Sequence, residues 1–314
     1  MIHSIRNFST ALLFATLFAL VGPILPNAAH ADELFVPSTS PQFKKYWYAG
    51  EAEISRYDLK QVRYGEVHEG DAVMIFVTEN FLADEQVKDE GWPSEGKSES
   101  ILKLNLTKKF ITGIYPYSVM TSVFTPVDKR KTPSWKVTAS TQEWCGQTYM
   151  QLNFRDNGFE GLHHSYFQKE GDSTFRLESA LLEDEIWTLI RLGASDLPTG
   201  EIEIVPALTH LRMTRQTASI ENATATLGEV DGLSESGSPL KAYEVAYAGS
   251  GRKIRIVFES NFPFSIERWS ETHPGRRGDE PLVTEAVRTH TIKLDYWNRN
   301  GSEDIGLRDG LGLR

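Results

Sequence analysis

This sequence has a single cysteine, and its basic residues are outnumbered by its acidic ones. Cys145 is the one cysteine among 314 residues, which excludes an internal disulfide, so a hydrophobic core must hold the fold. The 33 Lys and Arg residues stand against 43 Asp and Glu, giving a formal net charge of −10. An acidic surface repels nucleic acid and anionic lipid, which excludes nucleic acid as a partner.

The longest apolar run lies at the start of the chain. A positive charge at Arg6 precedes an apolar stretch over residues 11–25, which is shorter than a bilayer-spanning helix. Small residues at Ala29 and Ala31 then suit signal peptidase. This order predicts a secretory signal peptide over residues 1–31. We therefore expect a periplasmic or secreted protein with no stable membrane span after cleavage.

Most of the remaining chain alternates apolar and polar residues. A period of two predicts half-buried strands, because successive side chains of a strand point to opposite faces. The clearest examples are residues 102–106, 135–139, 243–247, 254–258 and 292–296. Residues 72–77 are continuously apolar instead, which is typical of a strand covered on both faces.

Short turns connect several of these strands. Asn157-Gly158 supplies residues that accept positive φ angles, and Gly249-Ser250-Gly251 does the same further on. Strands joined by such turns are antiparallel neighbours. The apolar parity also slips by one residue near Gly146, which predicts a turn or bulge there.

One long amphipathic helix is predicted near 175–192. Leu177, Leu181 and Ile186 fall close to one face at helical spacing, and Gly193 follows as a stop signal. The acidic run at 183–185 is interpreted as the solvated side of this helix. A shorter helix is expected to begin near Ser40, with Pro41 at its first position.

These patterns predict a mainly β fold. It is either one large curved antiparallel sheet or two packed β blocks, half-barrel or sandwich-like, with the one long helix. The expected division is a signal peptide (1–31), a first β block (32–172), a helical connection (173–198), a second β block (199–298) and a flexible tail (299–314).

Residues 91–98 spell a phosphate-binding loop, Gly-Trp-Pro-Ser-Glu-Gly-Lys-Ser. Such a loop needs an apolar strand before it and a helix after it, so that backbone N–H groups converge on phosphate. Here polar and acidic residues precede it, and the strand at 102–106 follows. Pro93 removes a donor and Glu95 repels phosphate. We interpret the segment as an ordinary loop and expect no cofactor.

Cys145 is the weak candidate for a catalytic nucleophile. A thiolate needs a neighbouring histidine as its base, and His163 and His164 lie across the predicted hairpin. The alternative is a small side chain packed at a strand irregularity. Since adjacent histidines on a strand point to opposite faces, they do not chelate one ion, and no metal site is predicted.

Aromatic residues are plentiful and clustered. They either line a pocket for an apolar ligand or pack in the core of a large β protein. The candidate ligand-binding residues are Trp47, Tyr48, Tyr115, Tyr117 and Trp144.

Several strings resemble an uncharacterised bacterial exported β-rich family over nearly the whole mature chain. They are Trp47-Tyr48-Ala49-Gly50, Thr112-Gly113-Ile114-Tyr115-Pro116-Tyr117-Ser118, Glu143-Trp144-Cys145-Gly146, Leu197-Pro198-Thr199-Gly200-Glu201 and Leu294-Asp295-Tyr296-Trp297. Members sometimes carry the label "septum formation inhibitor Maf". Maf pyrophosphatases have a Ser-x-Ser-Pro-Arg-Arg signature, which this chain lacks. The resemblance therefore implies export and ancestry but no catalytic residue.

Three functions remain open from the sequence. The first is a non-catalytic exported protein that binds an apolar ligand, lipid or envelope component in the hollow of its sheet. The second is a protein-binding envelope factor without a small ligand, and the third is a hydrolase that uses Cys145. A concave cavity favours the first, and a flat exposed apolar patch favours the second.

Overall fold

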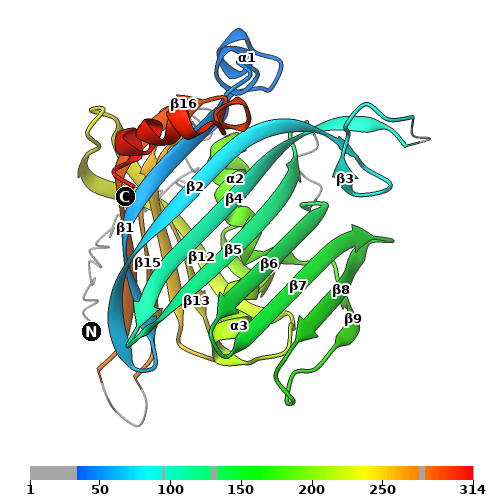
Figure 1. The fold of residues 1–314 in the computed structure, drawn as a ribbon, viewed down its shortest axis with the longest axis vertical. Coiled ribbons are helices and arrows are strands. Elements are labelled where there is room, and N and C mark those ends of the chain that lie inside the picture. Colours follow the sequence, from blue (N-terminus) through cyan, green and yellow to red (C-terminus); the bar gives the residue numbers. More distant parts are fainter. Residues whose placement is uncertain (1–33, 94–95, 129–132, 276–279, 314) are drawn as a thin grey trace, which may run out of the picture.

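The computed structural model describes residues 34–93, 96–128, 133–275 and 280–313 (Figure 1). The signal peptide expected at 1–31 lies outside these residues. One 16-stranded sheet dominates the fold and is antiparallel except between β10 and β11. This confirms the mainly β prediction and decides between its two forms, because the two expected β blocks are halves of a single sheet.

The strands follow one another along the chain. They are β1 (Ala52–Arg63), β2 (Glu66–Leu82), β3 (Val87–Lys88), β4 (Ser98–Thr112), β5 (Tyr115–Pro126), β6 (Lys136–Glu143), β7 (Gly146–Arg155), β8 (Gly158–Ser165), β9 (Ser173–Glu178), β10 (Leu181–Leu182), β11 (Gly200–Val205), β12 (Glu221–Leu233), β13 (Pro239–Tyr247), β14 (Lys253–Glu259), β15 (Ile266–His273) and β16 (Leu282–Leu294). The helices are α1 (Pro41–Trp47), α2 (Ile186–Gly193) and α3 (Leu208–Thr214), with 3₁₀ helices at Glu183–Glu185, Ala194–Asp196, Tyr296–Asn298 and Ser302–Leu311.

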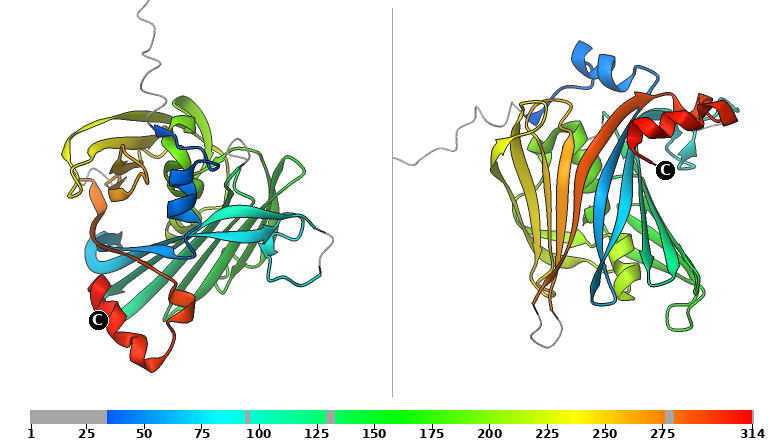
Figure 2. Two further views of the ribbon diagram at one scale, coloured as in Figure 1. Left: turned by 90° about the horizontal axis from the view of Figure 1, so that it is seen from above. Right: turned by 60° about the vertical axis from the view of Figure 1, so that its left-hand side comes forward.

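The first strand lies in the middle of the sheet. β1 pairs with β2 on one side and with β16, the last strand, on the other. From β2 the chain runs strand by strand to one edge at β9, then crosses to the opposite edge at β10 and returns through β11 to β16. The sheet curves strongly, and Figure 2 shows it wrapping around α2 and α3. The curved sheet therefore encloses a hollow, and the chain passes directly from one edge strand, β9, to the other edge strand, β10.

Cross-strand register builds the core on the concave face. Phe76, Leu104, Val123, Val137 and Leu152 lie opposite one another on five adjacent strands, and all five are buried. The alternation in the sequence sets this row, because a slip of one residue in any strand would turn its apolar side chains to the other face.

The long helix predicted at 175–192 is present only in its second half, as α2. Phe175 and Leu177 instead belong to strand β9, where they lie opposite Gly161 and Phe159 of β8. The ring of Phe175 fills the space where Gly161 has no side chain. Because both residues are apolar at a spacing of two, the segment satisfies a strand as well as a helix, and pairing with β8 decides the outcome.

Helix α2 fills the upper part of the hollow. It packs against β4 and β5 through buried side chains that include Ile186 and Ile190. Arg191 on the same helix donates to Glu53 of β1, with 2.6 Å from Nη2 to Oε2. α3 lies lower in the hollow and packs against β5 and β6 (Figure 1). The two helices thus leave the space at the lower end of the hollow only partly filled.

The C-terminal segment, expected to be a flexible tail, carries a 3₁₀ helix. Ser302–Leu311 packs beside β16, and Leu311 is buried in a cluster with Ile54 of β1 and Val73 and Val77 of β2. This cluster lies on the convex face, opposite the core row. It explains why residues 72–77 are apolar on both faces, as the sequence predicted.

Three local predictions concern turns and caps. The short helix near Ser40 is confirmed as α1, with the Ser40 side chain accepting from the amide of Phe43. The turn between β7 and β8 is one residue earlier than expected, because Asp156 and Asn157 adopt the positive φ angles. The phosphate-loop lookalike leads into strand β4, so no helix follows it to direct N–H groups at a ligand.

Among the described residues, no helix is both long enough and apolar enough to cross a membrane.

Candidate functional site

The concave face changes from apolar to polar toward one end of the hollow. On β15, Trp269 is apolar and faces inward, and the next two inward positions are Glu271 and His273. On β4 the inward positions Leu102, Leu104 and Leu106 are followed by Lys108. This end carries the β1–β2 and β15–β16 connections and lies at the bottom of Figure 1.

A cavity of about 770 Å³ lies at this polar end. Its wall combines the end of β1, the concave faces of β4 and β5, helix α3, the β13–β14 turn and the end of β15. The lining residues are Gln61, Val62, Arg63, Tyr64, Gly65, Lys108, Val119, Thr209, His210, Met213, Thr214, Arg215, Gln216, Ser250, Arg252, Glu271, His273, Pro274, Gly275, Glu280 and Leu282.

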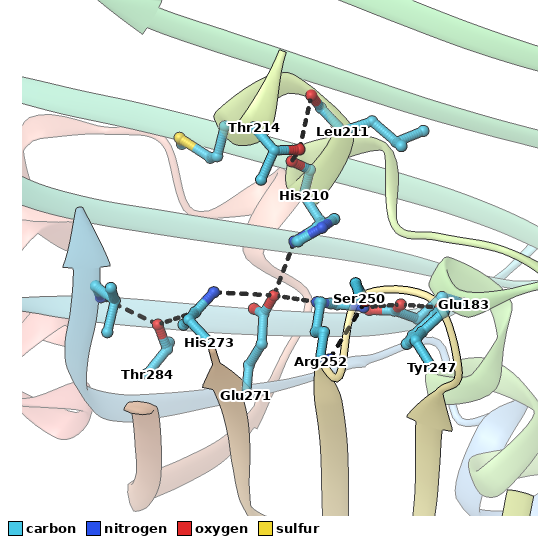
Figure 3. Close-up of polar contacts among 12 residues, drawn as sticks. Glu183, His210, Leu211, Thr214, Tyr247, Ser250, Arg252, Glu271, His273 and Thr284 are labelled. Carbon is cyan, nitrogen blue, oxygen red and sulfur yellow. Dashed lines mark hydrogen bonds and ion pairs between the residues drawn. The ribbon is translucent and has the colours of Figure 1, made fainter. Parts of the chain in front are cut away.

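Glu271 is the centre of the polar network in this wall (Figure 3). Its Oε1 lies 3.1 Å from Nδ1 of His210 on α3 and accepts from Nε of Arg252 at 2.5 Å. The other two guanidinium nitrogens of Arg252 donate to Glu183 at 2.6 and 2.7 Å. Burial alone would raise the pKa of Glu271, but the charge of Arg252 outweighs it and holds that pKa well below its usual value. Glu271 therefore stays ionised.

His273 is fixed by a second set of hydrogen bonds. The Thr284 hydroxyl accepts from the amide of Val62 at 3.0 Å and from Nε2 of Gln61 at 3.2 Å. These two donors occupy both lone pairs of the oxygen, so its proton is left for Nε2 of His273, 3.1 Å away. Burial lowers the pKa of His273, and Glu271 only partly opposes it. We infer a neutral imidazole whose Nδ1–H faces Glu271.

Lys108 places an ammonium group in the same wall. Its Nζ lies 5.9 Å from the ring centroid of Trp269, on the face of the sheet that bounds the cavity. Burial lowers the pKa of Lys108, while the negative charges of Glu271 and Glu183 oppose that effect. Among the residues that the structure describes, none accepts a hydrogen bond from this ammonium or pairs with it directly.

His210, Glu271 and His273 also have the composition of a metal site. One ligand atom from each lies within 4.8 Å of the others, a proximity that the sequence analysis did not anticipate. However, Arg252 already occupies Glu271 Oε1, and Lys108 adds a second positive charge to the wall. These two positive charges in the same wall oppose the binding of a divalent ion. The donor set therefore fits a metal poorly.

The sequence-predicted aromatic residues divide between the two ends of the hollow. Trp47 and Tyr48 lie at the far end of the hollow, where they form the C-terminal end of α1. Trp47 is buried with the Arg191 guanidinium over its ring, and the Tyr48 hydroxyl lies 3.0 Å from that of Ser100. Neither lines the cavity.

Tyr115, Tyr117 and Trp144 lie near the cavity mouth. The hydroxyl of Tyr64, which lines the cavity, is 3.1 Å from that of Tyr115 and 2.7 Å from that of Tyr117. Trp144 stacks on Tyr115 with ring centroids 6.1 Å apart, and 68% of it is exposed. The structure thus brings these three together around Tyr64, which the sequence analysis did not single out.

Cys145 lies exposed in the turn between β6 and β7. Its amide donates to Oε2 of Glu143 at 2.8 Å, and the same carboxylate raises the pKa of the Cys145 thiol. This is the opposite of what an activated nucleophile needs, since the reactive species is the thiolate.

The two candidate histidines face carboxylates. His163 Nε2 lies 3.8 Å from Glu170 Oε2, and His164 Nδ1 lies 3.3 Å from Asp172 Oδ1. Both histidines are on β8, in register with Met150 and Tyr149 of β7. No contact of either imidazole with the Cys145 thiol occurs among the described residues.

The acidic run at 183–185 is buried, which corrects its interpretation as a solvated helix face. Each carboxylate has a specific partner. Glu183 pairs with Arg252, Asp184 accepts from the amide of Leu208 at 2.8 Å, and Glu185 accepts from the amide of Ser134 at 2.6 Å. These contacts tie the start of α2 to the β13–β14 turn, α3 and the β5–β6 connection. Composition alone cannot show this, because buried partners are distant in sequence.

Comparison with known proteins adds little. No family model matches the chain, and no curated protein matches it. Among solved structures it is similar to a crystal structure described as a "Beta-barrel-like Protein of Domain of Unknown Function DUF1849" from Brucella abortus. That similarity has a TM-score of 0.48 and 9% sequence identity, over 77% of this chain and 97% of the other. It assigns no activity, ligand or site.

Proposed function

We propose that this protein is a non-catalytic binding protein that holds a small, partly apolar molecule in the cavity of its curved sheet. The cavity of about 770 Å³ carries this proposal, because its volume is typical of small-molecule sites. Val119, Met213 and Leu282 contribute apolar side chains to the wall. An apolar molecule or an envelope lipid that enters from the polar end of the hollow would cover these side chains.

Binding accounts for the polar wall better than catalysis does. Glu271 is held by His210 and Arg252, so its charge is already neutralised by fixed partners. The hydroxyl bonded to His273 belongs to Thr284, which is fully buried and accepts two other hydrogen bonds. It cannot reach a ligand as a nucleophile. A wall of mutually bonded side chains orients a ligand without reacting with it.

We also propose that binding takes place outside the cytoplasm. The support is the export signal predicted at 1–31, together with the resemblance to an exported family. The ligand would then be an apolar small molecule or an envelope component that the protein meets in the periplasm or after secretion.

A neutral fluorescent probe tests the proposal without assuming a head group. N-phenylnaphthylamine should bind the purified protein with a saturable rise in fluorescence. Met213→Trp places an indole in the cavity and should weaken binding at least about tenfold. Val67→Trp is the matched control, because Val67 is 46% exposed on β2 and does not line the cavity.

Val67→Trp should leave binding unchanged. Absence of saturable binding by the wild-type protein would remove the basis of the proposal. Equal loss in both variants would also contradict it, because the probe would then bind elsewhere. In that case the protein-binding alternative would lead.

A further inference from the structure

The cavity wall is positively charged in an otherwise acidic protein. Four of its lining residues are Lys or Arg, at 63, 108, 215 and 252, and two are Glu, at 271 and 280. The whole chain carries a formal net charge of −10. A local reversal of sign inside a concave site concentrates the field there and attracts anions.

Most of these charges are already committed to protein partners. Arg252 is shared between Glu183 and Glu271. Arg63 donates to the carbonyl of Met213 at 2.7 Å, and Arg215 lies 3.8 Å from Glu170. Lys108 differs, since within the described part of the chain no carboxylate forms an ion pair with it and its three N–H donors have no acceptor. An ammonium in a partly buried wall is stabilised when an anion satisfies those donors.

Apolar surface adjoins this ammonium. Lys108 lies opposite Ala72 of β2 and Val119 of β5 in the sheet register, and both neighbours are buried. Val119 lines the same cavity, as do Met213 and Leu282. A molecule seated here meets a cation at one point of the wall and hydrocarbon at others.

We infer that the ligand of this cavity is an amphipathic anion whose head group, a carboxylate or a phosphate ester, binds the Lys108 ammonium. This inference rests on the proposed function and adds the chemical class of the ligand. The apolar part of the molecule lies against Val119, Met213 and Leu282. Arg252 and His273 border the same space but are held by their own partners, so Lys108 supplies the free donors.

Competition against bound N-phenylnaphthylamine tests the head group. Decanoate, decyl phosphate and decanol share a chain and differ in charge. The wild-type protein should bind at least one of the two anions about tenfold more tightly than decanol, the usual effect of one charge-assisted hydrogen bond. The stronger of the two anions identifies the source as a free fatty acid or a phosphate ester.

Adjacent lysines supply a matched pair of variants. Lys108→Met should abolish the preference for the anion over decanol, and Lys108→Arg should keep it. Lys109→Met should have no effect, because Lys109 is exposed on the opposite face of β4. The competition between the two anions and decanol is measured on the wild-type protein. It therefore still tests the inference if Lys108→Met does not fold.

Two outcomes separate this inference from the proposed function. If the probe binds but the wild-type protein holds decanol as tightly as both anions, the inference is overturned and the cavity remains a neutral site. A preference for the anion that persists in Lys108→Met also overturns it, because another cation would then bind the head group. If the probe itself does not bind, the proposed function fails first.

Discussion

Arg191 on α2 donates from two guanidinium nitrogens to the two carboxylate oxygens of Glu53 on β1, 138 residues away in the chain. Neither side chain is exposed to solvent by more than 2%. The Tyr46 hydroxyl also donates to Glu53, and Arg191 Nε donates to the carbonyl of Pro263 at 2.9 Å. This pair fixes the helix that fills the hollow to the strand at the centre of the sheet.

Removing the cation of this pair should destabilise the protein strongly. Arg191→Met leaves the Glu53 carboxylate buried without its counter-ion, which typically costs about 3–5 kcal/mol. Urea unfolding at pH 7.5 measures the loss. Glu53→Gln combined with Arg191→Met should cost less than Arg191→Met alone, because no unpaired charge remains. Equal losses in the single and double variants would contradict this account.

The loss should also depend on pH. Burial alone would raise the pKa of Glu53, but Arg191 outweighs it and lowers that pKa below its usual value. In the wild type, the stability contributed by the ionised Glu53 carboxylate is therefore fully present above pH 4.5. It is lost only as pH falls through the lowered pKa of Glu53. In Arg191→Met the strongest opposing charge is gone and burial raises the pKa of Glu53, so the variant should recover stability as pH falls. Arg299→Met, at an exposed pair with Asp295, is the control and should change little.

Asp184 should make the protein less stable as pH rises. Burial raises the pKa of its carboxyl to about 7, the charge of Glu183 adds to that effect, and the amide of Leu208 opposes it. The unfolded chain loses this proton near pH 3.8, while the folded chain keeps it until about 7. The folded state therefore binds more protons between these values, and its stability falls across that window.

Asp184→Asn should remove this dependence. The amide oxygen still accepts from the Leu208 N–H group, but no charge forms at high pH. At pH 4 the variant should nearly match the wild type, and at pH 8 it should be more stable by roughly 4 kcal/mol, since the pKa rises from 3.8 to about 7 on folding and one pKa unit corresponds to about 1.4 kcal/mol. Unfolding at several pH values measures the difference. Curves that stay parallel from pH 4 to pH 8 would show that Asp184 is not protonated in the folded protein.

The sequence predicted the sheet well because strand periodicity is a local signal. The alternation at residues 102–106 defines the concave face of β4, and its continuation by two residues places Lys108 in the cavity wall. The same alternation places Trp269, Glu271 and His273 on the inward face of β15, which the sequence analysis did not predict. Polar residues at inward positions of a strand are the signal for this site.

Other features could not be read from the sequence. The pairing of Glu271 with His210 joins β15 to α3 across 61 residues, and nothing in either segment specifies the other. The helix predicted at 175–192 failed for a related reason. The first half of this segment fits the apolar spacing of both a strand and a helix, and only the tertiary contact with β8 selects the strand. Contacts between elements that are distant in the sequence therefore cannot be predicted from local patterns.

Cys145 should behave as an unactivated thiol. The Glu143 carboxylate raises its pKa, so at a given pH a smaller fraction is thiolate than in an ordinary exposed cysteine. Iodoacetamide should therefore alkylate Cys145 more slowly at pH 8 than it alkylates a model peptide, and hardly at all at pH 6. Glu143→Gln should speed the reaction at pH 8, because it removes the negative charge that disfavours the thiolate. Glu160→Gln, an exposed substitution on β8, should leave the rate unchanged.

The opposite result would restore a catalytic role. Rapid labelling at pH 6 requires a base that holds the thiol ionised, and the histidines on β8 are the nearest candidates in the sequence. If His163→Asn or His164→Asn abolished such labelling, an imidazole would have to reach Cys145 in solution. The ion partners of both histidines, Glu170 and Asp172, argue against this, since they hold each ring toward a carboxylate. Alkylation rates measured across pH therefore decide between an unactivated, exposed turn residue and a nucleophile.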